Sequence, residues 1–200
     1  MTKYLIPLAL LVLLGLPLIY ESTPTEVLKL KTFDALIPEQ QPSGYFTVLN
    51  ITEDDITREG GYPLPRQRLA EINTQLKEKG ALGIGWVVAF PQPDRFGGDE
   101  AFKQSLEDIP SVLAMFEGDN ALYPNTTGTV ILGEDVGGTP AAGVIQNIDL
   151  FKQSSQQGIA VARTEVDSLI RRLPLLLRTP DGWVPAYGTE VLKILVGADT

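Results

Sequence analysis

The sequence contains 200 residues, of which 44% are hydrophobic, and this is enough for one domain with a core plus a short appendage. Its 16 Lys and Arg residues against 25 Asp and Glu residues give a net charge of −9, and because no basic stripe is present, nucleic-acid binding is excluded. The absence of Cys and His removes thiol nucleophiles, disulfides, haem ligation, nearly all zinc chemistry and the usual general base.

An uncharged hydrophobic segment runs from Tyr4 to Tyr20, between Lys3 and Glu21. Its length is at the short end of what spans a bilayer, tyrosines at both ends suit the membrane interfaces, and Lys3 favours a cytoplasmic N-terminus. We therefore expect a transmembrane helix over residues 1–21 that anchors the chain, with the following domain outside the cytoplasm. A cleaved signal peptide is the main alternative, although no small-x-small cleavage pattern follows the segment.

Two segments follow the expected anchor. Residues 26–36 predict a juxtamembrane helix, which lies within a helix and linker region over residues 22–44. Residues 45–51 are rich in apolar residues and predict a first strand in a central position. Residues 45–200 are then expected to form one extracytoplasmic domain, in which residues 52–65 are a loop.

Residues 66–90 combine the clearest helix and strand signals of the chain. Apolar residues repeat at helical spacing from Leu69, Pro65 precedes the first turn, and Gly80 stands where a left-handed stop is needed. Residues 81–90 then contain no charged residue, which predicts a strand covered on both faces. Gly83 and Gly85 in this strand would let another element pack closely.

The order strand, helix, strand over residues 45–90 predicts a βαβ unit with a right-handed crossover. Farther along, Asp99 is the expected N-cap of a short helix in which Phe102 and Leu106 stack one turn apart. Strands at residues 159–163 and 169–178 are separated by the sequence TEVDS and followed by a second turn at 179–182, and hairpin pairing is expected in this region. The other predicted elements are strands at 111–116 and 130–132, a turn at 137–143, and helices at 147–156 and 186–196.

The predicted fold class is therefore α/β. A βαβ-based, mostly parallel central sheet is flanked by helices, with an antiparallel hairpin near the C-terminus and the hydrophobic membrane helix at the N-terminus.

Ligands of open parallel sheets bind at the carboxyl ends of the strands, so the loops at residues 52–65 and 91–99 are the expected walls of a site. The candidate ligand-binding residues in and beside these loops are Glu53, Asp54, Asp55, Arg66, Asp94 and Arg95. The three consecutive acids could present oxygens to a hard cation, but they lack EF-hand spacing, so a solvated acidic loop is the simpler interpretation and no metal site is expected.

Arg66 could reach an anionic ligand or form an ion pair within the fold. Arg171 and Arg172 alternate sides along a predicted strand, where ion pairing is expected. Trp86 and Trp183 have apolar neighbours and are expected in the core rather than as stacking platforms.

No enzymatic activity and no cofactor are expected. No Ser lies in a nucleophile elbow, no His exists, and the acids form no pair that the sequence places at catalytic separation. Asn50 and Asn125 both match the N-glycosylation acceptor pattern, and only Asn125, in a polar loop, is expected to be accessible.

Several short motifs, taken in chain order, resemble one family. LKLKTFDAL contains an aromatic-Asp pair, Phe33 and Asp34, and is followed by VLNITEDDI, by YPLPR at residues 62–66 and by GALGIGWVVAFPQPDR at residues 80–95. VDSLIRRLPLLL, at residues 166–177, resembles an Asp-Gly-x-x-Arg-Arg-x-Pro-Leu hairpin motif, and Pro185 resembles the start of a final helix. Together these features are similar to the CHASE2 domain, an extracytoplasmic sensor module of bacterial adenylate cyclases, histidine kinases and serine/threonine kinases.

The sequence departs from the CHASE2 pattern at three positions. Thr52 and Val87 stand where the family usually has Asp, and Ser168 replaces the Gly of the hairpin motif. If those acids form a polar site at the carboxyl edge of the sheet, that site is altered or lost in this chain.

The resemblance implies a non-catalytic, membrane-anchored receptor domain, periplasmic or extracellular, that binds an unknown small ligand or extracytoplasmic protein. It would relay the signal through residues 26–36 to an output domain not present in these 200 residues, and sensors of this kind usually form homo-oligomers. One alternative is an anchored structural or assembly subunit of a cell-surface polymer with a CHASE2-like fold. Another is a secreted binding protein from which residues 1–22 have been removed.

Overall fold

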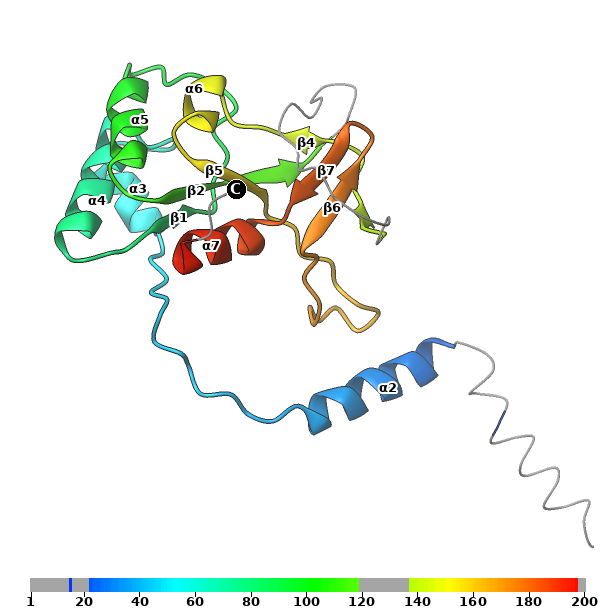
Figure 1. The fold of residues 1–200 in the computed structure, drawn as a ribbon. Helices are drawn as coiled ribbons and strands as arrows, with labels where there is room; N and C mark the ends of the chain where they lie inside the picture. The colour runs from blue at the N-terminus through cyan, green and yellow to red at the C-terminus, as the bar shows by residue number, and fades with distance from the viewer. Residues whose placement is uncertain (1–14, 16–21, 119–136, 198–200) are drawn as a thin grey trace, which may run out of the picture. The chain divides into compact units, whose positions relative to one another are not determined.

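The computed structural model describes residue 15, residues 22–118 and residues 137–197 of the chain (Figure 1). The chain forms two compact units. One contains the residues up to Leu49 together with Arg163–Arg171, and the other contains Asn50–Ala162 and the residues from Arg172 onward. Apart from Gly15, the predicted membrane helix lies outside the described residues, and no described helix is long and apolar enough to cross a bilayer.

The first unit contains the predicted juxtamembrane helix. Helix α2 (Thr23–Leu36) begins slightly before the predicted start, because Pro24 suits the first turn and the Thr25 hydroxyl accepts a hydrogen bond from the backbone N–H of Ser22 at 3.1 Å. Leu30 is buried at 2% exposure, whereas Leu28 and Leu36 are largely exposed. The helix therefore buries one narrow side and presents apolar residues on another.

The main sheet lies in the second unit. Strands β1 (Ile84–Trp86), β2 (Ser111–Glu117) and β5 (Gln156–Ile159) are parallel, and β4 (Val144–Ile145) pairs antiparallel with the end of β2. The residues of β2 from Ser111 to Met115 are all buried, as expected for a central strand covered on both faces. The predicted parallel sheet and its strand at residues 111–116 are confirmed.

Helices α4 (Arg66–Glu78) and α5 (Asp99–Glu107) pack together and precede β1 and β2 in the chain. Gly80 has the predicted left-handed backbone, with φ at +90°. The side chains that the two helices bury join a core with the sheet in which Phe90, Phe102 and Phe151 meet edge to face at centroid distances of 5.2–5.8 Å. Phe102 and Leu106 lie one turn apart in α5 as predicted, and both are buried, but the N-cap is Gly98 rather than the predicted Asp99.

Helix α7 (Tyr187–Val196) packs against β2 and β5, near the predicted position of the closing helix. Glycines in the strands make this close approach possible: a Cβ on Gly85 would lie 2.1 Å from the Tyr187 hydroxyl, and one on Gly158 would lie 2.6 Å from the Cα of Tyr187. A Cβ on Gly83 would likewise lie 2.9 Å from Ile194. The prediction that Gly83 and Gly85 permit close packing is confirmed, and α7 is the element that they admit.

A second sheet contains β3 (Thr139–Pro140), β6 (Leu176–Thr179) and β7 (Gly182–Pro185). The predicted antiparallel hairpin is present, but it joins β6 to β7 across the second turn, whereas β5 pairs in parallel with β2. Residues 169–175 are not a strand, so Arg171 and Arg172 do not alternate across a sheet. The remaining helices are α3 (Glu53–Arg58) and α6 (Asp149–Lys152), the second much shorter than predicted because β5 begins at Gln156.

The predicted first strand is absent. Residues 45–51 have no regular secondary structure, and Tyr45 and Val48 are more than 80% exposed. The prediction that residues 81–90 form a strand covered on both faces is also wrong: β1 contains only residues 84–86, and Leu82 and Val87 on either side of it are exposed. Among the described strands, none pairs along the outer edge of β1. A βαβ unit does form, but it uses β1, α5 and β2 rather than residues 45–90. The predicted strand at residues 130–132 lies outside the described residues.

Candidate functional site

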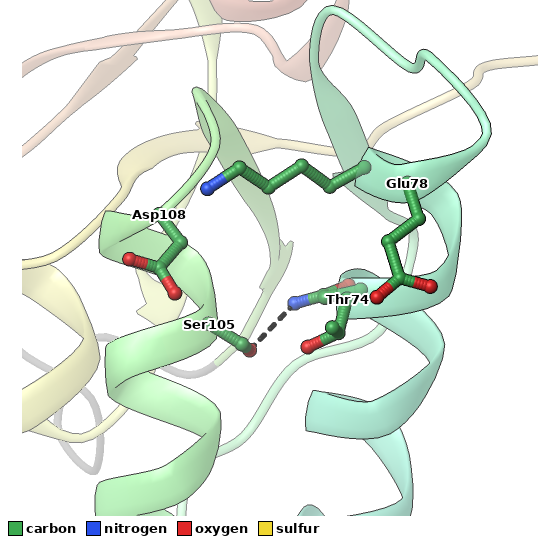
Figure 2. Close-up of a pocket in the computed structure, with 6 residues that line it drawn as sticks. Thr74, Glu78, Ser105 and Asp108 are labelled. Atoms are coloured by element: carbon green, nitrogen blue, oxygen red, sulfur yellow. Dashed lines mark hydrogen bonds between the residues drawn. The ribbon is translucent and has the colours of Figure 1, made fainter.

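A groove of about 420 Å³, lined by polar and charged residues, lies between the C-terminal ends of α4 and α5. Figure 2 shows Thr74 and Glu78 of α4 on one side and Ser105 and Asp108 of α5 on the other. Both helices run toward the amino ends of the strands that follow them, so the groove lies at the opposite end of the sheet from the loops that the sequence favoured. Its volume is within the range that small ligands occupy.

The floor of the groove is a buried chain of hydrogen bonds. The Trp86 indole donates to the Asn73 side-chain oxygen at 3.0 Å, and the Asn73 amide nitrogen donates to the Ser105 hydroxyl at 2.9 Å. That hydroxyl donates to the carbonyl of Phe102 at 2.7 Å. Asn73 is 1% exposed and Ser105 6%, so the chain fixes the positions of two polar groups beneath the rim.

Arg66 and Asp94, two of the predicted site residues, are brought together at the other end of α4. The backbone N–H of Arg66 donates to Asp94 Oδ2 at 2.9 Å, and the backbone N–H groups of Phe96 and Gly98 donate to the same carboxylate at 3.1 and 3.2 Å. Partial burial opposes ionisation of Asp94, but these three donors together with the Arg66 charge hold the pKa of its carboxyl below the usual value. Asp94 therefore fixes the loop at residues 94–98 against the start of α4.

The Arg66 side chain is also largely buried. Its guanidinium lies over the Phe90 ring at 4.3 Å, and its Nε is 3.8 Å from Asp99 Oδ1. Burial lowers the pKa of Arg66, while the charges of Asp94 and Asp99 oppose that shift. The charged partners lie within the fold, which agrees with the structural interpretation of Arg66.

The other predicted site residues do not join this cluster. Glu53, Asp54 and Asp55 form the first turn of helix α3, where a loop was predicted from the sequence. Asp55 accepts hydrogen bonds from the backbone N–H and hydroxyl of Thr52 at 2.9 and 2.6 Å, and these bonds lower the pKa of its carboxyl. The capping-box pattern at Thr52 and Asp55 is the signal that could have revealed the helix.

Arg95 lies over the Phe96 ring at 4.6 Å, and the described residues contain no group of three acids that could hold a metal ion. Asn125 lies outside the described residues, whereas Asn50, expected to be less accessible, is exposed because residues 45–51 do not enter a sheet.

A third cluster, which the sequence did not single out as a site, lies in the first unit around Arg171. The Arg171 Nε and Nη2 donate to the two carboxylate oxygens of Asp34, both at 2.7 Å, and Nη1 and Nη2 donate to Asp167 at 2.8 and 2.7 Å. Glu165 is 3.7 Å from Nη1. Asp34 is in the last turn of α2, so one guanidinium binds α2 and the loop at residues 163–171 together.

The charges of this Arg171 cluster stabilise one another's ionised forms. The hydrogen bonds from Arg171 lower the pKa of Asp34 and lower the pKa of Asp167 to about 2, and the same bonds raise the pKa of Arg171 above its ordinary value. The Arg171 side chain is only 6% exposed. Asp34, Asp167 and Arg171 therefore stay ionised across the physiological pH range.

The model of the CHASE2 domain matches residues 8–198 of the chain. The chain belongs to the CHASE2 family. CHASE2 domains are extracellular sensor domains. Asp34 lies in the segment LKLKTFDAL and Arg171 in the segment VDSLIRRLPLLL, and both segments resemble motifs of this family. Comparison with curated proteins and with solved structures found no significant match in either set.

Proposed function

We propose that this CHASE2 domain is a membrane-anchored, non-catalytic sensor that binds a ligand or protein outside the cytoplasm and relays the event through α2 to an output domain. Residues 4–20 would form the anchor, and α2 follows them directly in the sequence. A change in the position or order of α2 would then reach the membrane. The relay would be a population shift between two arrangements of this helix, biased by differential affinity of the ligand.

The observation that carries this proposal is the pair of bidentate contacts made by Arg171. α2 has apolar residues around most of its circumference and buries only Leu30, so its position depends on few packing contacts. The Asp34–Arg171 bonds supply a directional contact that a sensor could break and remake, because carboxylates on both sides of the guanidinium compete for its donors. Arg171 is followed in the chain by β6 and β7, whose hairpin leads to α7 of the second unit.

Spin labels can test this relay, because the chain has no native cysteine. Cysteines introduced at the exposed positions Lys31 of α2 and Leu169 of the loop would carry the labels in the full chain, reconstituted in lipid nanodiscs. The expected result is one narrow distance distribution that broadens or lengthens in Arg171→Gln. Arg95→Gln is the control, since it removes the same charge from the second unit without touching the Arg171 cluster. An unchanged distribution in Arg171→Gln would contradict the proposed relay.

Membrane anchoring is tested separately. We expect the full chain to stay in the membrane pellet after a carbonate wash, with its N-terminal segment intact by mass spectrometry. Recovery of a soluble product that lacks residues 1–22 would instead identify a secreted binding protein.

Residues 45–51 and helix α2 both expose apolar side chains, and such surfaces are typical of protein–protein interfaces. This observation favours a second candidate function, an anchored assembly subunit. Analytical ultracentrifugation in detergent distinguishes the two, because an assembly subunit forms higher oligomers without any ligand. Replacement of Tyr45 and Val48 by Ser should then dissolve those oligomers.

A further inference from the structure

The groove between α4 and α5 is surrounded mainly by negative charge. The last turn of an α-helix carries partial negative charge on its free carbonyls, and two such ends meet here. Glu78 and Asp108 add two carboxylates at the rim, and both side chains are exposed. Among the described residues no ion pair involves Glu78, and Asp108 accepts a 3.4 Å hydrogen bond from the Gln104 side chain. Lys77 lines the same groove with one positive charge, so the charged side chains of the lining carry a net charge of −1 and the rim still favours a cation.

The floor adds hydrogen-bonding capacity. An Asn amide nitrogen has two hydrogens, and Asn73 gives one of them to the Ser105 hydroxyl. A hydroxyl oxygen has two lone pairs, and Ser105 uses one to accept that bond. Within the described part of the chain, one amide hydrogen and one lone pair therefore remain for a ligand. Lys77, which also lines the groove, would supply a further donor to a ligand oxygen.

We infer that this groove binds a small organic cation: a primary ammonium group next to a hydroxyl or carbonyl oxygen, as in an amino alcohol. The ammonium group pairs with Glu78 and Asp108, and the oxygen accepts hydrogen bonds from Asn73 and Lys77. The groove is open and all its lining residues are polar or charged, which suits a compact polar molecule better than a large apolar one. This inference names the ligand class of the sensor proposed above, and it rests on that function only for its biological role.

Trp86 provides the signal of binding. Its indole N–H donates to the side-chain oxygen of Asn73, and Asn73 lines the groove, so a ligand that polarises this amide changes the environment of the indole. The chain has two tryptophans, and Trp183→Phe leaves Trp86 as the single emitter.

The test is a fluorescence titration of the full Trp183→Phe chain in detergent. Ethanolamine is the probe, propylamine lacks its oxygen, and ethylene glycol lacks its ammonium group. The expected result is a saturable change in Trp86 emission with ethanolamine, at least several-fold weaker binding of propylamine and no saturable change with ethylene glycol. No saturation with ethanolamine would overturn the inference, and equal binding of ethylene glycol would overturn the cationic assignment.

Matched variants locate the site. The double variant Glu78→Gln with Asp108→Asn should weaken ethanolamine binding at least tenfold, whereas Glu107→Gln, on the same end of α5 but outside the groove lining, should leave it unchanged. If Glu107→Gln weakened ethanolamine binding as much as the double variant does, the effect would come from the overall negative charge of the chain, and the proposed site would be wrong. Circular dichroism checks folding, which the exposed rim positions should not alter.

The spin-label distance between α2 and its loop separates the two proposals. If ethanolamine binds at the groove but leaves that distance unchanged, the binding site stands and the relay is contradicted. If Arg171→Gln changes the distance but ethanolamine does not bind, the relay stands and the ligand class is overturned.

Discussion

Ser168 has a backbone conformation that glycine adopts more easily than serine, at a position where the family pattern has glycine. Its φ is +65°, in the left-handed region, and the CHASE2 motif that this segment resembles has Gly at the same position. A residue with a Cβ is disfavoured there, because the Cβ approaches the following carbonyl oxygen. The turn is nevertheless closed, with the backbone N–H of Ser168 donating to the Glu165 carbonyl at 2.9 Å.

We therefore expect Ser168→Gly to stabilise the chain by up to about 1 kcal/mol, since glycine adopts this conformation without steric cost. Urea unfolding of the full chain in detergent would measure the change. Ser168→Ala keeps the Cβ and is the control. If Ser168→Ala raised the free energy of unfolding as much as Ser168→Gly does, backbone strain at this position would not be the cause.

Asp167 gives the first unit a defined pH dependence. Its pKa in the folded chain is about 2, below the ordinary value of 3.8, so the contribution of this carboxylate to stability is complete above pH 4 and disappears as the pH falls through 2. Asp167→Asn should therefore be less stable than the native chain at pH 6, and the difference should shrink between pH 4 and pH 2. Urea unfolding at a series of pH values measures it. A difference that stays constant to pH 2 would contradict the assignment.

At the scale of elements, glycines decide how α7 meets the sheet. A Cβ on Gly158 would collide with the backbone of Tyr187 and Ala186, which cannot rotate away, whereas Gly188 within α7 has open space around its Cα. The tight contact also buries the Tyr187 phenol, and burial raises its pKa to about 12.

Gly158→Ala should lower the free energy of unfolding by about 1–3 kcal/mol, as overpacking does in other cores. Gly188→Ala should raise it by about 0.5–1 kcal/mol, since alanine is the better helix former and meets no neighbour. The two free energies come from urea unfolding monitored by circular dichroism. Changes of the same sign in both variants would contradict the packing of α7 against these strands.

Predictability from sequence also differs among elements. α4, α7 and β2 were predictable because their signals are local: helical spacing of apolar residues, a glycine stop, or a run without charges. The strand expected at residues 45–51 has an equally good local pattern, but a strand exists only where another strand accepts its hydrogen bonds, and no partner pairs with it.

At the scale of the whole molecule, residues 38–49 connect α2 to the second unit as an exposed segment. Tyr45, Phe46 and Leu49 are all more than half exposed. Among the described residues, we expect the first chymotrypsin cuts at these three positions, because exposed backbone outside regular structure is cleaved most readily. Mass spectrometry of early digests identifies the cut sites. Earlier cuts within β1 or β2 would contradict the described fold.

The sequence alone was sufficient for the acidic, Cys- and His-free composition, the helix α4 with its glycine stop, and the motifs that resemble CHASE2, because composition and local spacing carry this information. It also singled out Arg66 and Asp94, which the structure brings together in one cluster. Only the tertiary structure revealed the groove between α4 and α5 and the contact of Arg171 with Asp34. Both unite side chains that are distant in the chain, and such proximity depends on how helices and loops pack rather than on any local pattern.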